Sequence, residues 1–230
     1  LRGAKRTVRS YVMNENREEF QRDLERIEAK VIELFAMVAE DLPRATDALL
    51  SGDNDALAVL IEREQIIDAL WPEIEELVNR EIVLQAPVAV DLRYLLSVLR
   101  IVPVLERAHD LVISIGSRAN HSLGEELTPR SRVIVERMSE LASAMWRQAA
   151  DAWYQRDKTA AFALSERDEE MDELHSSLTA ELASGQMAVQ VAMEMALVAR
   201  DYERLGAHAV NISRRVVYLA GSTPDSPPGT

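Results

Sequence analysis

The sequence contains no cysteine, and this absence excludes disulfide bonds, thiolate metal ligands and cysteine nucleophiles. Glycine and proline are scarce, with eight of each in 230 residues, which is too few for a protein built from sheets and tight hairpins. Aromatic residues make up only 5%, whereas the hydrophobic fraction of 47% is enough to form a sizeable core. Alanine, leucine, glutamate and arginine are abundant. This composition predicts an all-α protein made of long packed helices.

Positive charge is in deficit, because 26 lysines and arginines stand against 39 aspartates and glutamates and leave a formal net charge of −13. A nucleic-acid-binding domain normally carries a basic face, so we expect no nucleic-acid partner. Uncharged apolar runs of the ~18–20 residues that span a bilayer are also absent, so we expect no membrane insertion. An acidic protein of this kind suits the binding of cations or of basic partner surfaces, and the absence of cysteine fits a reducing cytoplasm.

Apolar residues recur at steps of three and four along most of the chain, which is typical of amphipathic helices. Asp53, Thr128 and Asp157 are suitable N-caps, and Gly185 separates the last two helices. The expected helices span roughly residues 20–51, 54–83, 87–120, 130–156, 158–184 and 186–221.

The two halves of the chain repeat each other. A shift of 104 residues places residues 45–71 over 149–175 without a gap, with ten of the 27 positions identical. A shift of 97 places Glu106-Arg107 over Glu203-Arg204. We therefore expect two tandem three-helix bundles, over residues 15–122 and 127–221. Residues 1–14 are expected to be a disordered or cloning-derived extension, and residues 222–230 a disordered tail.

Two pairs of acidic residues in the first repeat each have a spacing of four: Glu64 with Asp68, and Glu106 with Asp110. Residues at this spacing lie on one face of a helix, where two like charges cost roughly 0.2–0.5 kcal/mol unless a cation or a basic group offsets them. If the two helices pack side by side, four carboxylates converge on one surface.

The second repeat keeps three of these four acids. Asp168 and Asp172 correspond to the first pair and Glu203 to Glu106, but Ala207 stands at the fourth position. Clusters of carboxylate oxygens suit hard or borderline divalent cations, and iron and manganese bind in carboxylate-rich helical bundles. We therefore expect a metal site in each repeat, and we expect the first to be better occupied because the second lacks a ligand.

Histidines and arginines beside these acids leave other interpretations open. His109 and His208 would add nitrogen ligands for iron, nickel or zinc. Alternatively, Arg107 or Arg204 neutralises ordinary solvated acidic faces. Glu106-x-x-His109 also matches the ligand motif of di-metal carboxylate enzymes of the ferritin-like kind. Its loose second copy at His175 falls in the other repeat, and the chain has no phosphate-binding glycine loop, so we expect no enzyme.

Three segments resemble the PhoU family, the accessory and regulatory proteins of bacterial phosphate-specific transport. They are LQAPVAVDLR at residues 84–93, LERAHD at residues 105–110, and YERLGAHAVNI at residues 202–212. The last two resemble the family's repeated LERIGD motif, and the resemblance covers about residues 15–220. Ala207 replaces the aspartate of the second motif, and Ala108-His109 replaces Ile-Gly in the first.

The resemblance implies a fold of two three-helix bundles that bind metal ions through the paired acids. The cation would be iron, zinc, nickel, manganese or magnesium. It also implies a negative regulator of phosphate-starvation signalling, in contact with a phosphate ABC transporter ATPase and a sensor histidine kinase, peripheral to the inner membrane. A metal-binding module without a signalling role and a ferritin-like oxidase stay open as alternatives, as does a homodimer. The metal ligands carried over are Glu64, Asp68, Glu106, Asp110, Asp168, Asp172 and Glu203.

Overall fold

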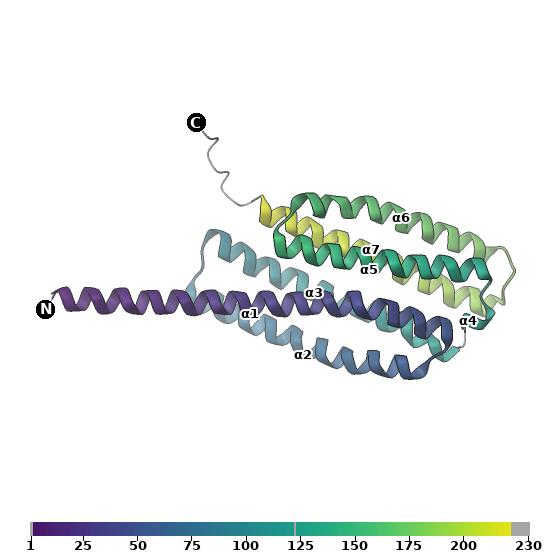
Figure 1. Ribbon diagram of the computed structural model, residues 1–230, viewed down its shortest axis with the longest axis horizontal. Helices are drawn as coiled ribbons and strands as arrows, with labels where there is room; N and C mark the ends of the chain where they lie inside the picture. The colour runs from purple at the N-terminus through teal and green to yellow at the C-terminus, as the bar shows by residue number, and fades with distance from the viewer. Residues whose placement is uncertain (1, 122, 222–230) are drawn as a thin grey trace, which may run out of the picture.

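The computed structural model describes the backbone of residues 2–121 and 123–221 and the side chains of residues 17–119 and 123–221. All regular secondary structure in the described residues is helical, so the all-α prediction is confirmed (Figure 1). The α-helices are α1 Arg2–Ser51, α2 Asn54–Gln85, α3 Ala89–Ser117, α4 Leu123–Glu126, α5 Pro129–Gln155, α6 Lys158–Ala183 and α7 Val189–Ala220. A short 3-10 helix, η1 Arg118–His121, lies between α3 and α4.

Three helices begin at the N-caps that the sequence predicts. The Asp53 carboxylate accepts hydrogen bonds from two backbone N–H groups of the first turn of α2, at 2.9 and 3.2 Å. Asp157 caps α6 in the same way, and Thr128 accepts a hydrogen bond from the N–H of Ser131 at the start of α5. These side chains satisfy donors that a helix start leaves without a partner, which stabilises each helix by about 1 kcal/mol.

The connections on both sides of α3 differ from the prediction. Ala86 and Ala89 have φ angles of 45° and 50°, so the chain turns there and α3 begins at Ala89, two residues after Pro87. At the other end, α3 stops at Ser117 and is followed by η1 and α4. The sequence predicted a single helix to about residue 120 and no further helical turn before α5.

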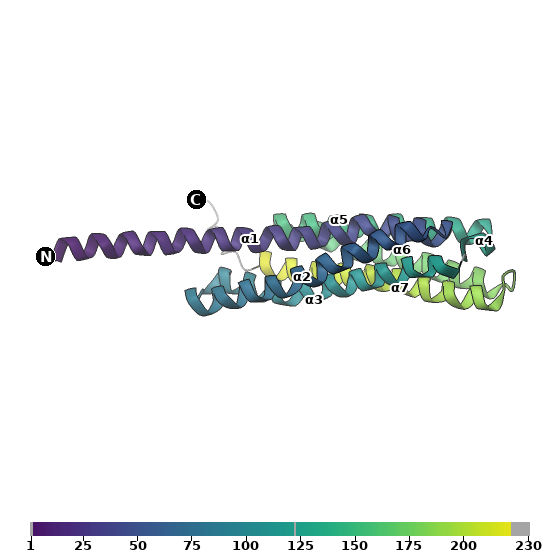
Figure 2. The same cartoon turned by 90° about the horizontal axis from the view of Figure 1, so that it is seen from below.

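The two three-helix units, α1–α3 and α5–α7, pack side by side through α1 with α5 and α3 with α7. Figure 2 shows α1 beside α5 on one side of the molecule, and α3 contacts α7 on the other. Their buried residues form one continuous hydrophobic cluster that includes Trp146 and Trp153. At the centre, the Thr46 hydroxyl from α1 bonds to Ser139 of α5 at 2.7 Å and to Tyr202 of α7. The tandem bundles therefore share a core, and a buried polar contact joins them.

The N-terminal part of α1 extends past the other helices (Figure 1). The backbone of residues 2–14 is helical, whereas the sequence favoured a disordered extension for this segment. Extending a helix that is already nucleated costs little, because each added residue gains one backbone hydrogen bond. The expected disordered tail, residues 222–230, lies outside the described residues.

Candidate metal centres

The first group of predicted ligands lies on α2 and α3. Glu106 is half-buried on α3, and burial raises its pKa above the ordinary glutamate value. The negative charges of Asp110, one turn along α3, and of Asp68, on α2, raise it further, and Arg107 opposes them. These three acids, Asp68, Glu106 and Asp110, are called the first carboxylate cluster below. The structure thus packs α2 beside α3, the condition on which the convergence of these acids depended.

The second group lies on α6 and α7. Burial raises the pKa of Asp168, and the charges of Asp172 and Glu203 add to this effect, with Arg214 acting against them. Asp168 lies close to the α7 backbone, because a Cβ added at Gly206 would be only 2.9 Å from its Oδ1. Asp168, Asp172 and Glu203 are called the second carboxylate cluster.

The two clusters use different members of the repeated acid pairs. The second lacks the acid that Ala207 replaces, as the sequence indicated. In the first, Glu64 is the equivalent of Asp168, but it is not among the charges that act on Glu106. The residue equivalent to Gly206 is His109, so the glycine contact that Asp168 makes in the second unit has no counterpart at Glu64. In each cluster, the charges of two acids therefore act on the pKa of a third. The first cluster has more potential metal ligands than the second only if Glu64 joins it.

The positive charges of Arg107 and Arg214 act on the clusters only from a distance. None of the seven predicted acids makes an ion pair or a side-chain hydrogen bond within the described residues. Glu73, an acid elsewhere on α2, is by contrast held by Lys30 at 2.7 Å and by Arg26 at 3.0 Å. As the side chains stand, no three Asp, Glu or His groups in the described parts of the chain are arranged to hold a metal ion. The clusters combine negative charge that no direct ion pair offsets with an open arrangement of carboxylates.

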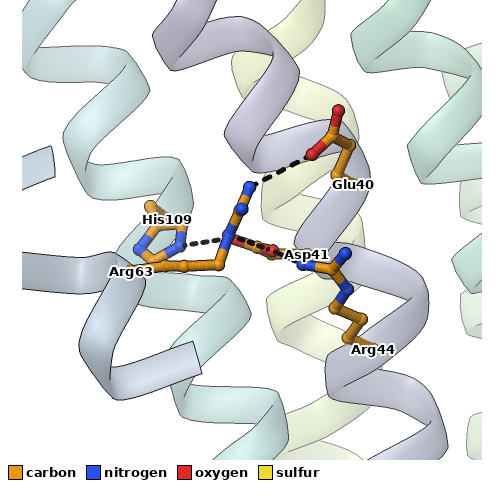
Figure 3. A network of polar contacts seen from close by, with 5 residues as sticks. All are labelled: Glu40, Asp41, Arg44, Arg63 and His109. Carbon is orange, nitrogen blue, oxygen red and sulfur yellow. Dashed lines mark hydrogen bonds and ion pairs between the residues drawn. The ribbon is translucent and has the colours of Figure 1, made fainter. Parts of the chain in front are cut away.

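His109, expected as an additional ligand, is fully buried and faces away from the solvated acids toward α1. Its Nε2 lies 3.1 Å from an oxygen of Asp41, which is also fully buried (Figure 3). The Nε of Arg63, from α2, approaches the same carboxylate to 2.7 Å, and Arg44 lies 3.2 Å from it. The other ring nitrogen of His109, Nδ1, has no hydrogen-bond partner among the described residues. His109 thus belongs to a buried polar network that joins three helices.

Asp41 and Arg63 were missed by the sequence reasoning. Burial by itself would raise the pKa of Asp41, but hydrogen bonds from His109 and Arg63 outweigh it and hold that pKa below the ordinary aspartate value. The signal was present in the sequence, because Asp41 falls between Val38 and Ala45 on the apolar face of α1. An acid at such a position requires a buried partner.

His208, the other candidate nitrogen ligand, lies between the two units. Burial lowers its pKa, and the neighbouring charges of Arg204 on α7 and Arg107 on α3 lower it further. Its Nε2 is buried without a hydrogen-bond partner in the described structure. A neutral imidazole is the form that coordinates metals, but the charges that act on His208 are arginines rather than cluster acids.

Comparison with known proteins identifies the repeat. The model of the PhoU domain matches the chain twice, at residues 31–119 and 135–216, so each match contains one of the carboxylate clusters. The chain belongs to the PhoU family. A PhoU homologue of Zymomonas mobilis, named a phosphate-specific transport system accessory protein, is 30% identical over 205 residues, covering 87% of this chain and 86% of the relative. A homologue of the same name from Aquifex aeolicus is 32% identical over 203 residues, covering 86% and 91%.

Solved PhoU structures have the same architecture. The crystal structure of PhoU from Pseudomonas aeruginosa superposes with a TM-score of 0.82 at 26% identity, over 89% of this chain and all of that one. PhoU from Streptococcus pneumoniae, a phosphate transport system regulatory protein, superposes with a TM-score of 0.77 at 23% identity, over 90% of this chain and 100% of that one, and shows the shared fold. The names of these PhoU proteins describe accessory and regulatory proteins, in agreement with the prediction that the chain is not an enzyme. In the described residues of this PhoU protein, no helix has the length and apolar character needed to cross a membrane.

Proposed function

We propose that this PhoU protein is a metal-binding regulator of phosphate uptake and of the phosphate-starvation response. It acts in the cytoplasm, peripheral to the inner membrane, as a negative regulator. Its partners are the ATPase of a phosphate ABC transporter and a sensor histidine kinase. The names of its relatives, which are accessory proteins of phosphate-specific transport systems, support a role in phosphate uptake. A net charge of −13 suits docking on basic partner surfaces.

The observation that supports metal binding is the pair of carboxylate clusters, one in each PhoU repeat, whose acids have no direct ion-pair partner. Partial burial and then repulsion among the acids raise the pKa of Glu106 and of Asp168. A bound cation would relieve both costs by placing positive charge between the carboxylates. The donor set, oxygen ligands with several negative charges, fits divalent cations such as magnesium and manganese, and also iron, nickel or zinc.

The first cluster would hold a cation through Asp68, Glu106 and Asp110, with Glu64 as a fourth ligand. The second would use Asp168, Asp172 and Glu203. Asp68, Asp110 and Asp172 are exposed, so their side chains can rotate to bring carboxylate oxygens toward an ion. The metal would supply charge neutralisation that ties α2 to α3 and α6 to α7.

Elemental analysis of protein purified without chelators or a metal-affinity tag tests the metal. We expect a divalent or transition metal close to stoichiometric amounts in the wild type and less in Asp110→Ala. Glu136→Ala, which removes an exposed acid of α5, is the matched control and should bind as the wild type does. Metal-free wild-type protein that also fails to take up added Mn²⁺, Fe²⁺ or Zn²⁺ would remove metal binding from the proposal.

Deletion of the gene tests the regulatory part separately. We expect phosphate-starvation genes to be expressed constitutively in the deletion strain and to be repressed again by the wild-type gene. Unchanged phosphate control in the deletion strain, together with metal in the purified protein, would leave a metal-binding module without a signalling role. Full complementation by a variant that binds no metal would show that regulation does not need the clusters.

A further inference from the structure

The buried carboxylate of Asp41 contacts the two helices that carry the first cluster. Through Arg63 it is linked to α2, and through His109 to α3, at 2.7 and 3.1 Å (Figure 3). Both partners are sequence neighbours of predicted ligands, because Arg63 precedes Glu64 and His109 precedes Asp110. One anchor on α1 therefore restrains the rotation of α2 and α3 beside the acids that a cation would need.

At the equivalent place in the second unit, the contact between the helices is made by uncharged residues. By the repeat, Asp41 corresponds to Met145 and His109 to Gly206. In the structure these two residues are neighbours, since a Cβ added at Gly206 would lie 3.6 Å from Met145 Cε. The PhoU fold therefore tolerates an apolar contact at this place. Buried ion pairs are often no more stabilising than such contacts, so stability alone does not account for the charged version.

We infer that Asp41 is a positioning residue for the first carboxylate cluster, acting through Arg63 and His109; this inference rests on the proposed metal binding. Hydrogen-bonded groups behind a metal site orient its ligands, and their loss typically lowers metal affinity by about 10–100-fold. Here the oriented elements are whole helices, since Arg63 and His109 belong to the backbone turns that carry Glu64 and Asp110. The second cluster has no equivalent anchor and is independent of Asp41.

The test is Mn²⁺ titration by calorimetry in two backgrounds. Asp172→Ala weakens the second cluster, so Mn²⁺ affinity in this background is that of the first cluster. Asp110→Ala weakens the first cluster, so the affinity measured there is that of the second. In the first background, Asp41→Leu should weaken Mn²⁺ binding about tenfold or more. In the second background the same change should leave the affinity within about twofold. Val31→Ala, a core truncation elsewhere on α1, controls for general destabilisation and should not alter the affinity of folded protein.

The conservative variant Asp41→Asn keeps the shape of the side chain and covers the case in which Asp41→Leu does not fold. It should fold and weaken the first cluster about threefold or more, because the amide holds Arg63 less strongly than a carboxylate does. Wild-type affinity in folded Asp41 variants would overturn the inference and leave metal binding intact. An Asp172→Ala protein that binds no Mn²⁺ at all would overturn metal binding at the first cluster and this inference with it.

Discussion

The Nε2 of His109 lies 3.1 Å from Asp41, and neither side chain is exposed to solvent. In the resemblance to the PhoU motif, His109 stands where a glycine is expected, so this contact explains a departure that the sequence alone left without a cause. The imidazole fills the position and supplies a partner for a carboxylate that would otherwise be buried with arginines only. The acid on α1 and the histidine on α3 are therefore coupled by direct contact.

Removing the carboxylate should destabilise the protein strongly. Asp41→Ala leaves Arg63 and His109 without their buried acceptor, and breaking a buried pair in this way costs about 3 kcal/mol. Urea unfolding followed by circular dichroism measures the change. Glu40→Ala is the control, because this neighbouring acid is exposed and its ion pair with Arg63 at 3.2 Å should contribute less than about 1 kcal/mol. If both variants lost the same free energy of unfolding, the buried carboxylate of Asp41 would not be the stronger contributor to stability.

The clusters should make metal-free stability depend on pH. Burial and neighbouring acids raise the pKa of Glu106 and of Asp168, so the folded protein binds protons more tightly there than the unfolded chain. Their unfavourable contribution is therefore full above the raised folded pKa values and disappears as pH falls through them to the unfolded values of about 4. We expect Glu106→Gln with Asp168→Asn to be more stable than wild type near pH 7 and to lose this advantage as pH falls to about 4. Parallel pH profiles in urea unfolding would contradict it.

Asp41 should act in the opposite direction at lower pH. Hydrogen bonds hold its pKa below the ordinary value, so its stabilisation is complete above the unfolded pKa of about 4 and is lost as pH falls through the lower folded value. Comparison of wild type with Asp41→Asn over this acid range measures it. The stability difference between the two proteins should shrink as pH falls, and a constant difference would count against the assignment.

Restoring the missing acid should strengthen the second cluster. Ala207 is exposed and occupies the position equivalent to Asp110, so Ala207→Asp adds a fourth carboxylate without disturbing the core. We expect Mn²⁺ affinity in the Asp110→Ala background to rise several-fold, because added ligand charge increases cation affinity. Ala180→Asp adds the same charge at an exposed position on α6 outside the cluster and should have little effect.

The tight contact between α4 and the end of α1 should not accept a side chain. A Cβ at Gly124 would lie 2.0 Å from the backbone oxygen of Leu50, so Gly124→Ala must move one of the two segments. We expect a loss of about 3 kcal/mol, as for other overpacked sites. Gly185→Ala is the comparison, because that site has open space and a φ of +76°, and its cost should be about 1–2 kcal/mol from backbone strain. Thermal unfolding distinguishes the two.

The sequence by itself determined the helical fold, its repeat and most helix ends. These follow from local chemistry: apolar periodicity selects helices, and Asp53, Thr128 and Asp157 can satisfy a first turn without help from distant residues. The spacing of four also predicted that the acids of each pair share one face of a helix, whereas their convergence depended on the packing of the two helices.

Only the tertiary structure decided which partners the charged residues have. Helix rotation and packing separate His109 from the acids around it, turn it to Asp41 on α1, and set Asp168 against Gly206 while Glu64 has no such contact. Such choices depend on distances between residues far apart in the chain, and a side chain on a helix meets whichever neighbour its rotation presents. The sequence predicted the candidate ligands, and the packing of α1 against α2 and α3 decided the surroundings of those in the first cluster.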